Sequence, residues 1–244
     1  MKEPITSILE RIEFRFVQEQ EEGTFDPREG AVAPAAWQGA DVANTYIHDS
    51  ETKIFAHPEL LRMSRGITVA MSYVINQLVK GMPEGRSFVN VGVWHGYSFL
   101  SAIVDNPGRE CVGVDHFLEF KENSGREQFY GLYTKFRTPG SRFFEMEFKE
   151  YFRTKHQGPI GVYFYDGDHS YQAHGDAFTH AAPFFVSGTY IVIDDIDRPE
   201  VYKAILDFLG KPENLNAYEV VLDRKTKHGF HPTWHCGIVV IKKL

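Results

Sequence analysis

Short hydrophobic runs alternate with amphipathic stretches along most of the chain. The runs at 87–91, 111–114, 160–165 and 189–193 have the length and composition of buried strands, and the stretches between them show the apolar spacing of helices. Strands separated by helices of this length are typical of a parallel sheet covered on both faces. We therefore predict an α/β fold with a doubly wound, mostly parallel, Rossmann-like sheet.

The last two predicted strands, 218–222 and 237–241, have no crossover helix between them, so we expect them to pair antiparallel. This places the loop 228–235 on the sheet edge that also carries the glycine turn described below. Two histidines of this loop have a spacing found in zinc sites, but no cysteine pair accompanies them. Its ring-bearing residues are instead predicted to shape a substrate pocket: His228, His231, Trp234 and His235.

The amino-terminal third of the chain carries weaker patterns. Residues 5–20 predict a short amphipathic helix, and residues 21–44, rich in Gly, Pro and Ala, have no period and predict a loop or arm. Residues 58–80 predict one helix with a wide apolar face, which Gly81 and Pro83 end. We divide the chain into an arm, residues 1–57, that acts as a lid or oligomer contact, and a ligand-binding domain, residues 58–244.

Length and charge narrow the possible partners. The 244 residues suffice for one large domain, or little more, with a buried core. The chain has 26 basic and 33 acidic residues, a net charge of -7 and no basic run, which argues against nucleic acid as a partner. The arm makes a homodimer or a higher homo-oligomer the expected assembly.

The sequence also indicates a cellular compartment. Its charged amino terminus lacks the apolar core of a signal peptide, and no apolar segment approaches the length of a membrane span. Cys111 and Cys236 both lie in or beside apolar runs, which is typical of reduced thiols rather than a disulfide framework. We therefore expect a cytoplasmic protein with no membrane partner.

A glycine turn follows the first predicted strand. Gly92 and Gly96 precede a helix, and the next strand ends at Asp115, so the turn and the acid meet at the carboxyl edge, where such folds bind ligands. A carboxylate there suits a ribose diol. Trp94 stands where a dinucleotide fingerprint has its second glycine, and no Walker ending exists. The predicted ligand is a nucleoside without a tightly cradled phosphate; the alternative is a tight turn that binds nothing.

Carboxylates follow two other buried strands. Asp166 and Asp168 come after the strand at 160–165, and Asp194, Asp195 and Asp197 end or follow the strand at 189–193. Like charges that converge in this way are costly unless they are solvated or a cation compensates them. Oxygen ligands in this number suit Mg²⁺ or another hard divalent ion. The alternative is that some of these aspartates cap the helices that follow.

Four segments carry a resemblance to a known family: VNVGVWHGYS, CVGVD, FYDGDHSY and IVIDDI. Together they resemble the class I S-adenosylmethionine-dependent methyltransferases. Within this class the chain is most similar, over residues 60–244, to small-molecule O-methyltransferases with a DGDHSY-type motif, including antibiotic-sugar O-methyltransferases. The resemblance implies S-adenosylmethionine as cofactor, Mg²⁺ as metal, and a sugar or phenol hydroxyl of a secondary metabolite as substrate.

The resemblance also assigns residues to the cofactor. One departure from the family is Asn90, which stands where the family normally has an acid on the first strand. An amide can still accept a hydrogen bond but carries no charge. The remaining positions match the methionine part (Gly92, Gly96, Ser98), the ribose (Asp115) and the adenine (His116, Phe117, Glu147, Phe148).

The metal and the proton acceptor are assigned in the same way. Asp166, Asp194 and Asp195 match the metal positions of the divalent-cation-dependent members, so the ion would bind and activate a substrate hydroxyl beside Asp166. His169 stands where related catechol-type enzymes place a lysine base, and an imidazole has a suitable pKa for accepting the proton. The alternative for His169 is a local role in helix capping or hydrogen bonding.

Two other functions remain open at this point. One is an enzyme that binds the same cofactor and metal but performs different chemistry, similar to a cephalosporin hydroxylase. The other is a non-catalytic binding protein that kept the sheet and lost turnover, for which Asn90 is the main support.

Overall fold

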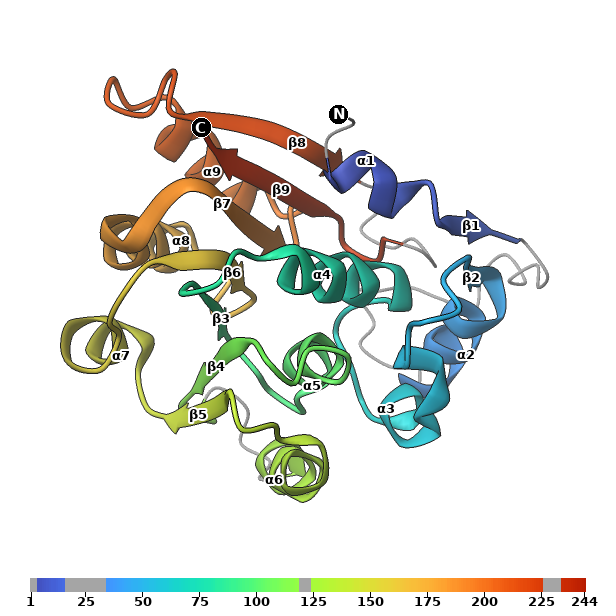
Figure 1. Ribbon diagram of the computed structural model, residues 1–244. Coiled ribbons are helices and arrows are strands. Elements are labelled where there is room, and N and C mark those ends of the chain that lie inside the picture. Colours follow the sequence, from blue (N-terminus) through green and yellow to red (C-terminus); the bar gives the residue numbers. More distant parts are fainter. Residues whose placement is uncertain (1–3, 16–33, 119–123, 226–233) are drawn as a thin grey trace.

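The computed structural model describes residues 4–15, 34–118, 124–225 and 234–244. Their central feature is a sheet of seven strands: β3 (Ser87–Val91), β4 (Glu110–Asp115), β5 (Ser141–Glu145), β6 (Ile160–Tyr165), β7 (Phe185–Asp194), β8 (Tyr218–Arg224) and β9 (Ile238–Lys243). The strand order is β5-β4-β3-β6-β7-β9-β8 (Figure 1). β3 to β7 run parallel, and β9 is antiparallel to both β7 and β8. The predicted mostly parallel α/β sheet with an antiparallel last strand is confirmed.

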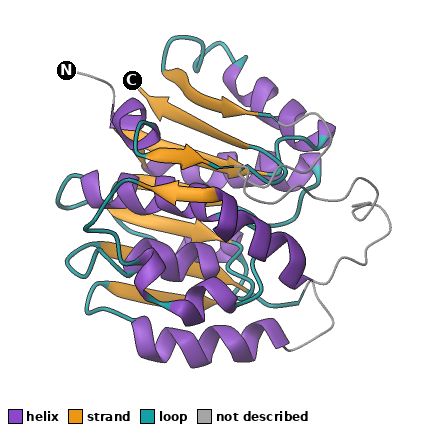
Figure 2. Cartoon of the chain, turned by 90° about the vertical axis from the view of Figure 1, so that its right-hand side faces the viewer, coloured by secondary structure: helices purple, strands orange, loops and turns teal. Residues whose placement is uncertain are grey.

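Helices cover both faces of this sheet (Figures 1 and 2). Along β3, Phe88 packs into one core cluster, while Val89 and Val91 pack into the other, as the two-residue period of a strand requires. Each core cluster therefore lies between the sheet and one helix layer. The first layer is α4 (Val69–Gly81), α5 (Tyr97–Ile103) and α6 (Ser124–Phe136); the second is α7 (Phe148–Thr154), α8 (Tyr171–Ala181) with the 3₁₀ turn η2 (Ala182–Phe184), and α9 (Pro199–Leu209).

The amino-terminal helix is shorter than predicted. α1 (Pro4–Leu9) ends where the chain turns to form β1 (Ile12–Phe14), which pairs antiparallel with β2 (Thr45–Ile47). The predicted helix over 5–20 is therefore wrong for residues 10–15, and its residues 16–20 lie outside the described residues. The apolar spacing was real, because Ile5 and Ile8 are buried in the same core cluster as α4.

The predicted loop over 21–44 is wrong for its second half. α2 (Pro34–Asn44) is helical, with Pro34 at its first position, where the fixed φ of proline suits a helix. Alanine, the best helix former, recurs along it. Residues 21–33 lie outside the described residues. α2 runs directly into β2.

The predicted single helix over 58–80 is two helices. α3 (Pro58–Arg62) follows the 3₁₀ turn η1 (Ile54–Ala56), and α4 starts again at Val69. Thr68 caps α4, since its hydroxyl accepts the Met71 N–H at 3.2 Å. Between the helices lies Arg65, whose buried guanidinium pairs with Asp41 of α2. Arg65 is thus buried at the point where the helical pattern is interrupted.

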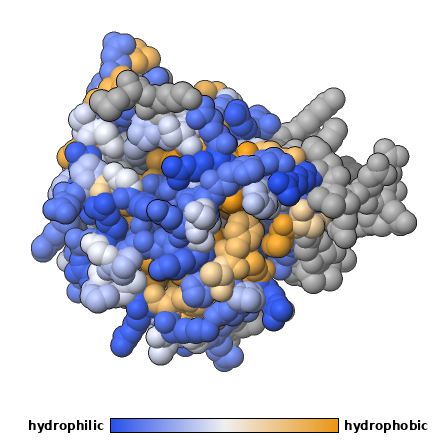
Figure 3. Space-filling model, turned by 45° about the vertical axis from the view of Figure 1, so that its right-hand side comes forward, coloured by the Kyte–Doolittle hydropathy of each residue, from blue (hydrophilic) through white to orange (hydrophobic). Residues whose placement is uncertain are grey.

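The surface of the protein is mostly hydrophilic on the face shown in Figure 3. Figure 3 shows hydrophilic residues over most of one face and hydrophobic residues gathered near its middle. None of the helices formed by the described residues is both long enough and apolar enough to cross a lipid bilayer. Cys111 and Cys236 are free thiols.

Candidate active site

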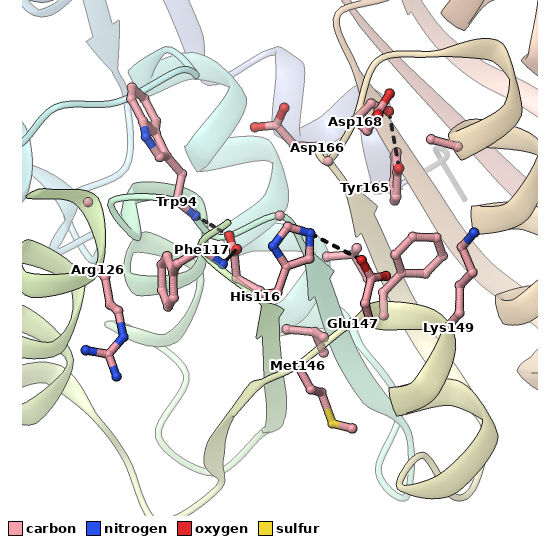
Figure 4. A pocket seen from close by; sticks show the side chains of 18 residues that line it. Trp94, His116, Phe117, Arg126, Met146, Glu147, Lys149, Tyr165, Asp166 and Asp168 are labelled. Carbon is pink, nitrogen blue, oxygen red and sulfur yellow. Dashed lines mark hydrogen bonds and ion pairs between the residues drawn. The ribbon is translucent and has the colours of Figure 1, made fainter. Parts of the chain in front are cut away.

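A pocket of about 300 Å³ opens at the carboxyl ends of β5, β4, β3 and β6 (Figure 4). The chain runs outward from β3 to β5 and returns to β6 on the other side of β3. The pocket therefore lies at a topological switch point, where open α/β sheets bind ligands. In Figure 4, Trp94 and Asp166 lie at its upper end and Met146 lies at its lower end. Six of the predicted cofactor residues line it: Gly92, Asp115, His116, Phe117, Glu147 and Phe148.

Asp115 holds the backbone that surrounds the pocket. Its Oδ2 accepts the N–H groups of Val93 and Trp94, both at 2.7 Å, and its Oδ1 accepts the Phe117 N–H at 2.7 Å. Trp94 and Phe117 have φ values of 49° and 54°, a left-handed conformation that is unfavourable for bulky residues and needs such support. A carboxylate has about four acceptor positions, so one on Oδ1 is left for a ligand hydroxyl. The ribose role of Asp115 stays a prediction.

The two glycines of the turn are required by packing. Gly92 has a φ of 79°, and a Cβ there would lie 1.9 Å from the backbone oxygen of Asp166. Gly96 has a φ of 106°, and a Cβ there would lie 2.6 Å from the ring of Phe129. Gly92 therefore lets the turn after β3 lie directly on the end of β6. Neither glycine needs a ligand to explain it.

Asn90 is buried under the turn and does not line the pocket. Its amide nitrogen donates to the Gly92 carbonyl at 2.8 Å, and its amide oxygen accepts the Ser98 hydroxyl at 2.9 Å. An ionised carboxylate could not donate to the Gly92 carbonyl. The departure from the family's acid at this position therefore has a structural reason, which removes Asn90 as support for a non-catalytic protein.

Asn90→Asp is expected to lower the free energy of unfolding by about 1–3 kcal/mol, because the Gly92 carbonyl loses its donor. Burial raises the pKa of such a carboxyl group, and its protonated form can still donate. The loss should therefore be smaller at pH 5 than at pH 8, and urea unfolding at both values measures it. Asn76→Asp is the matched control, since Asn76 is buried and donates to the Ser101 carbonyl away from the pocket. Tighter S-adenosylhomocysteine binding by Asn90→Asp at unchanged stability would contradict this role.

A second, smaller cavity of about 20 Å³ adjoins the first. Gly96 and Ser98, the other residues predicted for the methionine part, line it together with Gly66 from the α3–α4 connection. Trp94 and Asp166 line both cavities. The predicted methionine and nucleoside residues thus lie in adjoining cavities that meet at Trp94 and Asp166.

The predicted adenine residues form one side of the larger pocket. His116 Nε2 lies 3.4 Å from Glu147 Oε1, and His116 Nδ1 accepts the Leu118 N–H at 2.9 Å (Figure 4). These contacts assign the ring proton to Nε2, where it faces Glu147. The ring of Phe148 meets that of Tyr165 edge-on at 5.8 Å. The result is an apolar wall with a polar rim, as a nucleobase requires.

Several pocket residues were missed by sequence reasoning. Met146 directly follows β5, and Tyr165 is the last residue of β6, so position at a strand end was the available signal. Arg126 and Lys149 lie in the first turns of α6 and α7, but both are paired with carboxylates, Glu145 and Asp176. No motif singles out these four side chains.

Beside the pocket, three of the predicted residues form a compact cluster. His169 Nε2 lies 2.7 Å from Asp195 Oδ2 and 3.6 Å from Asp166 Oδ1, and one potential ligand atom from each residue lies within 4.8 Å of the others. Asp195 adopts a φ of 55°, which directs its side chain differently from that of a regular strand residue. Asp194 is not a member of this cluster. It is buried at the end of β7, and its Oδ1 has no hydrogen-bond partner among the described residues.

The charges of these groups are strongly coupled. Burial, followed by the charges of Asp166 and Asp195, raises the pKa of Asp194 well above its usual range. Burial also raises the pKa of Asp166. For Asp195, burial acts in the same direction, but the neighbouring His169 outweighs it and lowers the pKa to about 2. For His169, burial lowers the pKa, but the two carboxylates outweigh it and raise it to about 10. Without a cation, the imidazole thus holds its proton at neutral pH.

The histidine-rich loop is described only at its end. His228 and His231 lie outside the described residues. Trp234 is buried, with its ring 5.8 Å from that of Phe14, and lines neither cavity. His235 lies close enough to Asp195 for each to shift the pKa of the other. The described end of this loop therefore lies on the predicted sheet edge, next to the Asp166, His169 and Asp195 cluster.

Comparison with known proteins identifies the central part of the chain. A family profile described as a methyltransferase domain matches residues 89–196, from β3 through the residue after Asp195. The match covers 108 of the 244 residues, and together with the strand order it supports a class I methyltransferase fold for this part of the chain. The match contains both the pocket and the cluster.

Solved methyltransferase structures share the fold of this chain. The O-methyltransferase TomG from Streptomyces achromogenes, involved in tomaymycin synthesis and solved with SAM, has a TM-score of 0.59 at 14% identity, over 87% of this chain and 99% of that one. An O-methyltransferase from Bacillus cereus in complex with SAH has a TM-score of 0.56 at 14% identity, over 80% and 91%. TrmN from Thermus thermophilus has 0.54 at 14%, over 79% of this chain but only 53% of its own. At these identities the likeness concerns the fold alone. A search of curated proteins finds no match.

Proposed function

We propose that the protein is an O-methyltransferase in which a divalent cation assists methyl transfer from S-adenosylmethionine to a small-molecule hydroxyl. The observation that carries this proposal is the position of Asp166. It lines both cavities and also belongs to the cluster with His169 and Asp195. A methyl donor in the cavities and a hydroxyl at the cluster would therefore meet beside a single residue.

The residues present fit a divalent cation. Asp166 and Asp195 offer carboxylate oxygens within 4.8 Å of each other, and the nearby Asp194 has a buried oxygen without a hydrogen-bond partner among the described residues. Burial and the charges of Asp166 and Asp195 raise the pKa of Asp194, and a cation would offset these charges. When bound, a divalent cation orients a hydroxyl and lowers its pKa.

The chain's own residues supply binding and alignment. Methyl transfer from a sulfonium is an in-line displacement whose reactive carbon comes from the cofactor, so the protein must fix the two reactants. Asp115 holds the turn from Val93 to Trp94 and keeps one acceptor position for a ribose hydroxyl. Trp94 and Asp166 bound the place where the two cavities meet. The pKa of about 10 argues against His169 as proton acceptor in the cation-free protein.

The acceptor that we propose is a hydroxyl of a sugar or phenol in a secondary metabolite. The net charge of -7 disfavours a polyanionic acceptor such as RNA. Structural similarity to TomG, involved in tomaymycin synthesis, supports a natural product. We keep the cytoplasmic location, the role of residues 1–57 as a lid or oligomer contact and the homo-oligomer as parts of this proposal.

Two measurements test the proposal. Calorimetric titration with S-adenosylhomocysteine is expected to show one site per chain. Incubation with methyl-labelled S-adenosylmethionine and a panel of glycosides, polyols and catechols is expected to label at least one hydroxyl. A chelator should remove this activity, and added divalent cation should restore it.

The outcomes separate the alternatives. No binding of S-adenosylhomocysteine would favour a non-catalytic protein. Binding without label transfer to any hydroxyl would favour other chemistry, as in the cephalosporin-hydroxylase alternative. Unchanged turnover in excess chelator would remove the cation from the mechanism and leave O-methyl transfer intact.

A further inference from the structure

His169 lies between β6 and α8, but the helix does not use it as a cap. Ser170 caps α8, since its Oγ accepts the Ala173 N–H at 3.2 Å. Asp168 completes the turn, since its Oδ1 accepts the Ser170 N–H at 2.6 Å. The local capping role considered for His169 is therefore already taken by its neighbours.

The ring nitrogen of His169 faces two carboxylates without forming a regular hydrogen bond. Nε2 is buried, 2.7 Å from Asp195 Oδ2 and 3.6 Å from Asp166 Oδ1. The 2.7 Å separation brings Nε2 as close to a carboxylate oxygen as a charged partner or a shared cation requires. One potential ligand atom from each of the three residues thus lies within 4.8 Å of the others, as around a shared cation.

The surroundings of this point are not those of a magnesium site. Mg²⁺ prefers oxygen ligands and keeps several waters, whereas imidazole suits later first-row ions. The third ligand atom here is a nitrogen. Cys236 lies close enough to Asp195 for the carboxylate, after burial, to raise the pKa of the thiol.

We propose that His169 Nε2 is a metal ligand together with Asp166 and Asp195, and that this site takes a first-row transition-metal divalent cation in preference to Mg²⁺. The proposal rests on the cation of the proposed function, and it replaces the role of His169 as proton acceptor. It specifies which ion the site selects and which side chain selects it.

Manganese provides a direct readout that needs no turnover. The chelator-treated full chain is titrated with MnCl₂, and pulsed EPR of the bound ion detects coupling to a ligand nitrogen. Wild type should show nitrogen coupling that changes when histidine is labelled with ¹⁵N. Competition should require a large excess of Mg²⁺. Absent Mn²⁺ binding, absent nitrogen coupling or equal competition by Mg²⁺ would each overturn the proposal.

Two substitutions at His169 sharpen the test. His169→Gln should lose the nitrogen coupling and weaken Mn²⁺ binding by at least the roughly 10–100-fold that loss of an outer-shell partner costs. His169→Asp gives an all-oxygen set and should shift preference toward Mg²⁺. His48→Gln is the matched control, because His48 Nε2 also lies beside a carboxylate, Glu13 at 2.6 Å, but is exposed and belongs to no group of three potential ligands among the described residues. A His169→Gln protein that is folded by circular dichroism and keeps the wild-type coupling would also overturn it.

Failure of the methyltransferase proposal would look different. S-adenosylhomocysteine titration reports on the cavities around Asp115, and the manganese signal reports on His169. A protein that binds Mn²⁺ through nitrogen but transfers no methyl group would keep this inference and lose the proposed function. A protein that methylates with Mg²⁺ and shows no nitrogen coupling would do the reverse.

Discussion

Gly92→Ala is expected to lower the free energy of unfolding by at least about 3 kcal/mol and to abolish S-adenosylhomocysteine binding. A non-glycine residue at a φ of 79° costs about 1–2 kcal/mol. The added Cβ would lie 1.9 Å from the Asp166 backbone oxygen, and overpacking in a rigid contact costs on the order of 1–3 kcal/mol more. Because both partners are backbone at strand ends, no side-chain rotation relieves the clash. Urea unfolding and calorimetry measure the two effects.

Gly85→Ala is the control that isolates the backbone term. Gly85 has a φ of 74°, close to that of Gly92, but a Cβ there would meet nothing within 4 Å. Its loss should stay within about 1–2 kcal/mol, and cofactor binding should not change. Equal unfolding midpoints for the two variants would show that contact with Asp166 contributes nothing. The difference in unfolding free energy between the two variants therefore measures the cost of the close contact between the turn after β3 and Asp166 at the end of β6.

The sequence was sufficient to predict the parallel strands of the sheet. β3, β4 and β6 are mostly apolar because both faces of the sheet are covered, and such runs are recognisable without knowledge of their neighbours. β1 and β2 are three residues each and exist only because they pair with one another across 30 or more positions of chain. The local apolar pattern does not reveal a pairing between distant segments, so the residues of β1 were predicted as part of a helix.

The prediction of a single helix over 58–80 was wrong for a related reason. The apolar spacing of α3 continues in phase into α4, so the pattern alone predicts one helix. The interruption depends on Arg65, which is buried only because Asp41 approaches it from α2. One local signal was available. Threonine is a common N-cap residue, and the Thr68 hydroxyl accepts the N–H of Met71, three residues later, at the start of α4.

Sequence reasoning located the site better than it assigned the roles within it. Acids at the ends of parallel strands must share one edge, so Asp115, Asp166 and Asp195 were placed there correctly. Which of two adjacent aspartates joins the cluster depends on the backbone. A left-handed φ turns Asp195 toward His169, while Asp194 stays in the strand and is buried. A one-residue choice of this kind cannot be made from a pattern with a period of two.

Asp41→Ala is expected to cost about 3–5 kcal/mol of stability, because it leaves the Arg65 guanidinium buried without a counter-charge. The carboxylate also accepts the Val69 N–H at 2.9 Å and the Thr45 hydroxyl at 3.2 Å, so α4 and β2 lose partners as well. Burial raises the pKa of Asp41, opposed by the charge of Arg65 and these hydrogen bonds. Glu51→Ala, which removes the exposed pair with Lys80, should leave the unfolding midpoint unchanged.

The double variant Asp41→Leu, Arg65→Met distinguishes the charge from the packing. Replacing a buried ion pair by apolar residues of similar volume is often neutral or stabilising, so most of the loss should be recovered. Failure to recover it would mean that the fixed geometry of the pair, not the unpaired charge, sets the cost. Arg65 also lines the small cavity with Ser98 and Asp166. A stable double variant with weakened S-adenosylhomocysteine binding would therefore show that α2, outside the matched residues 89–196, shapes the cofactor site through this pair.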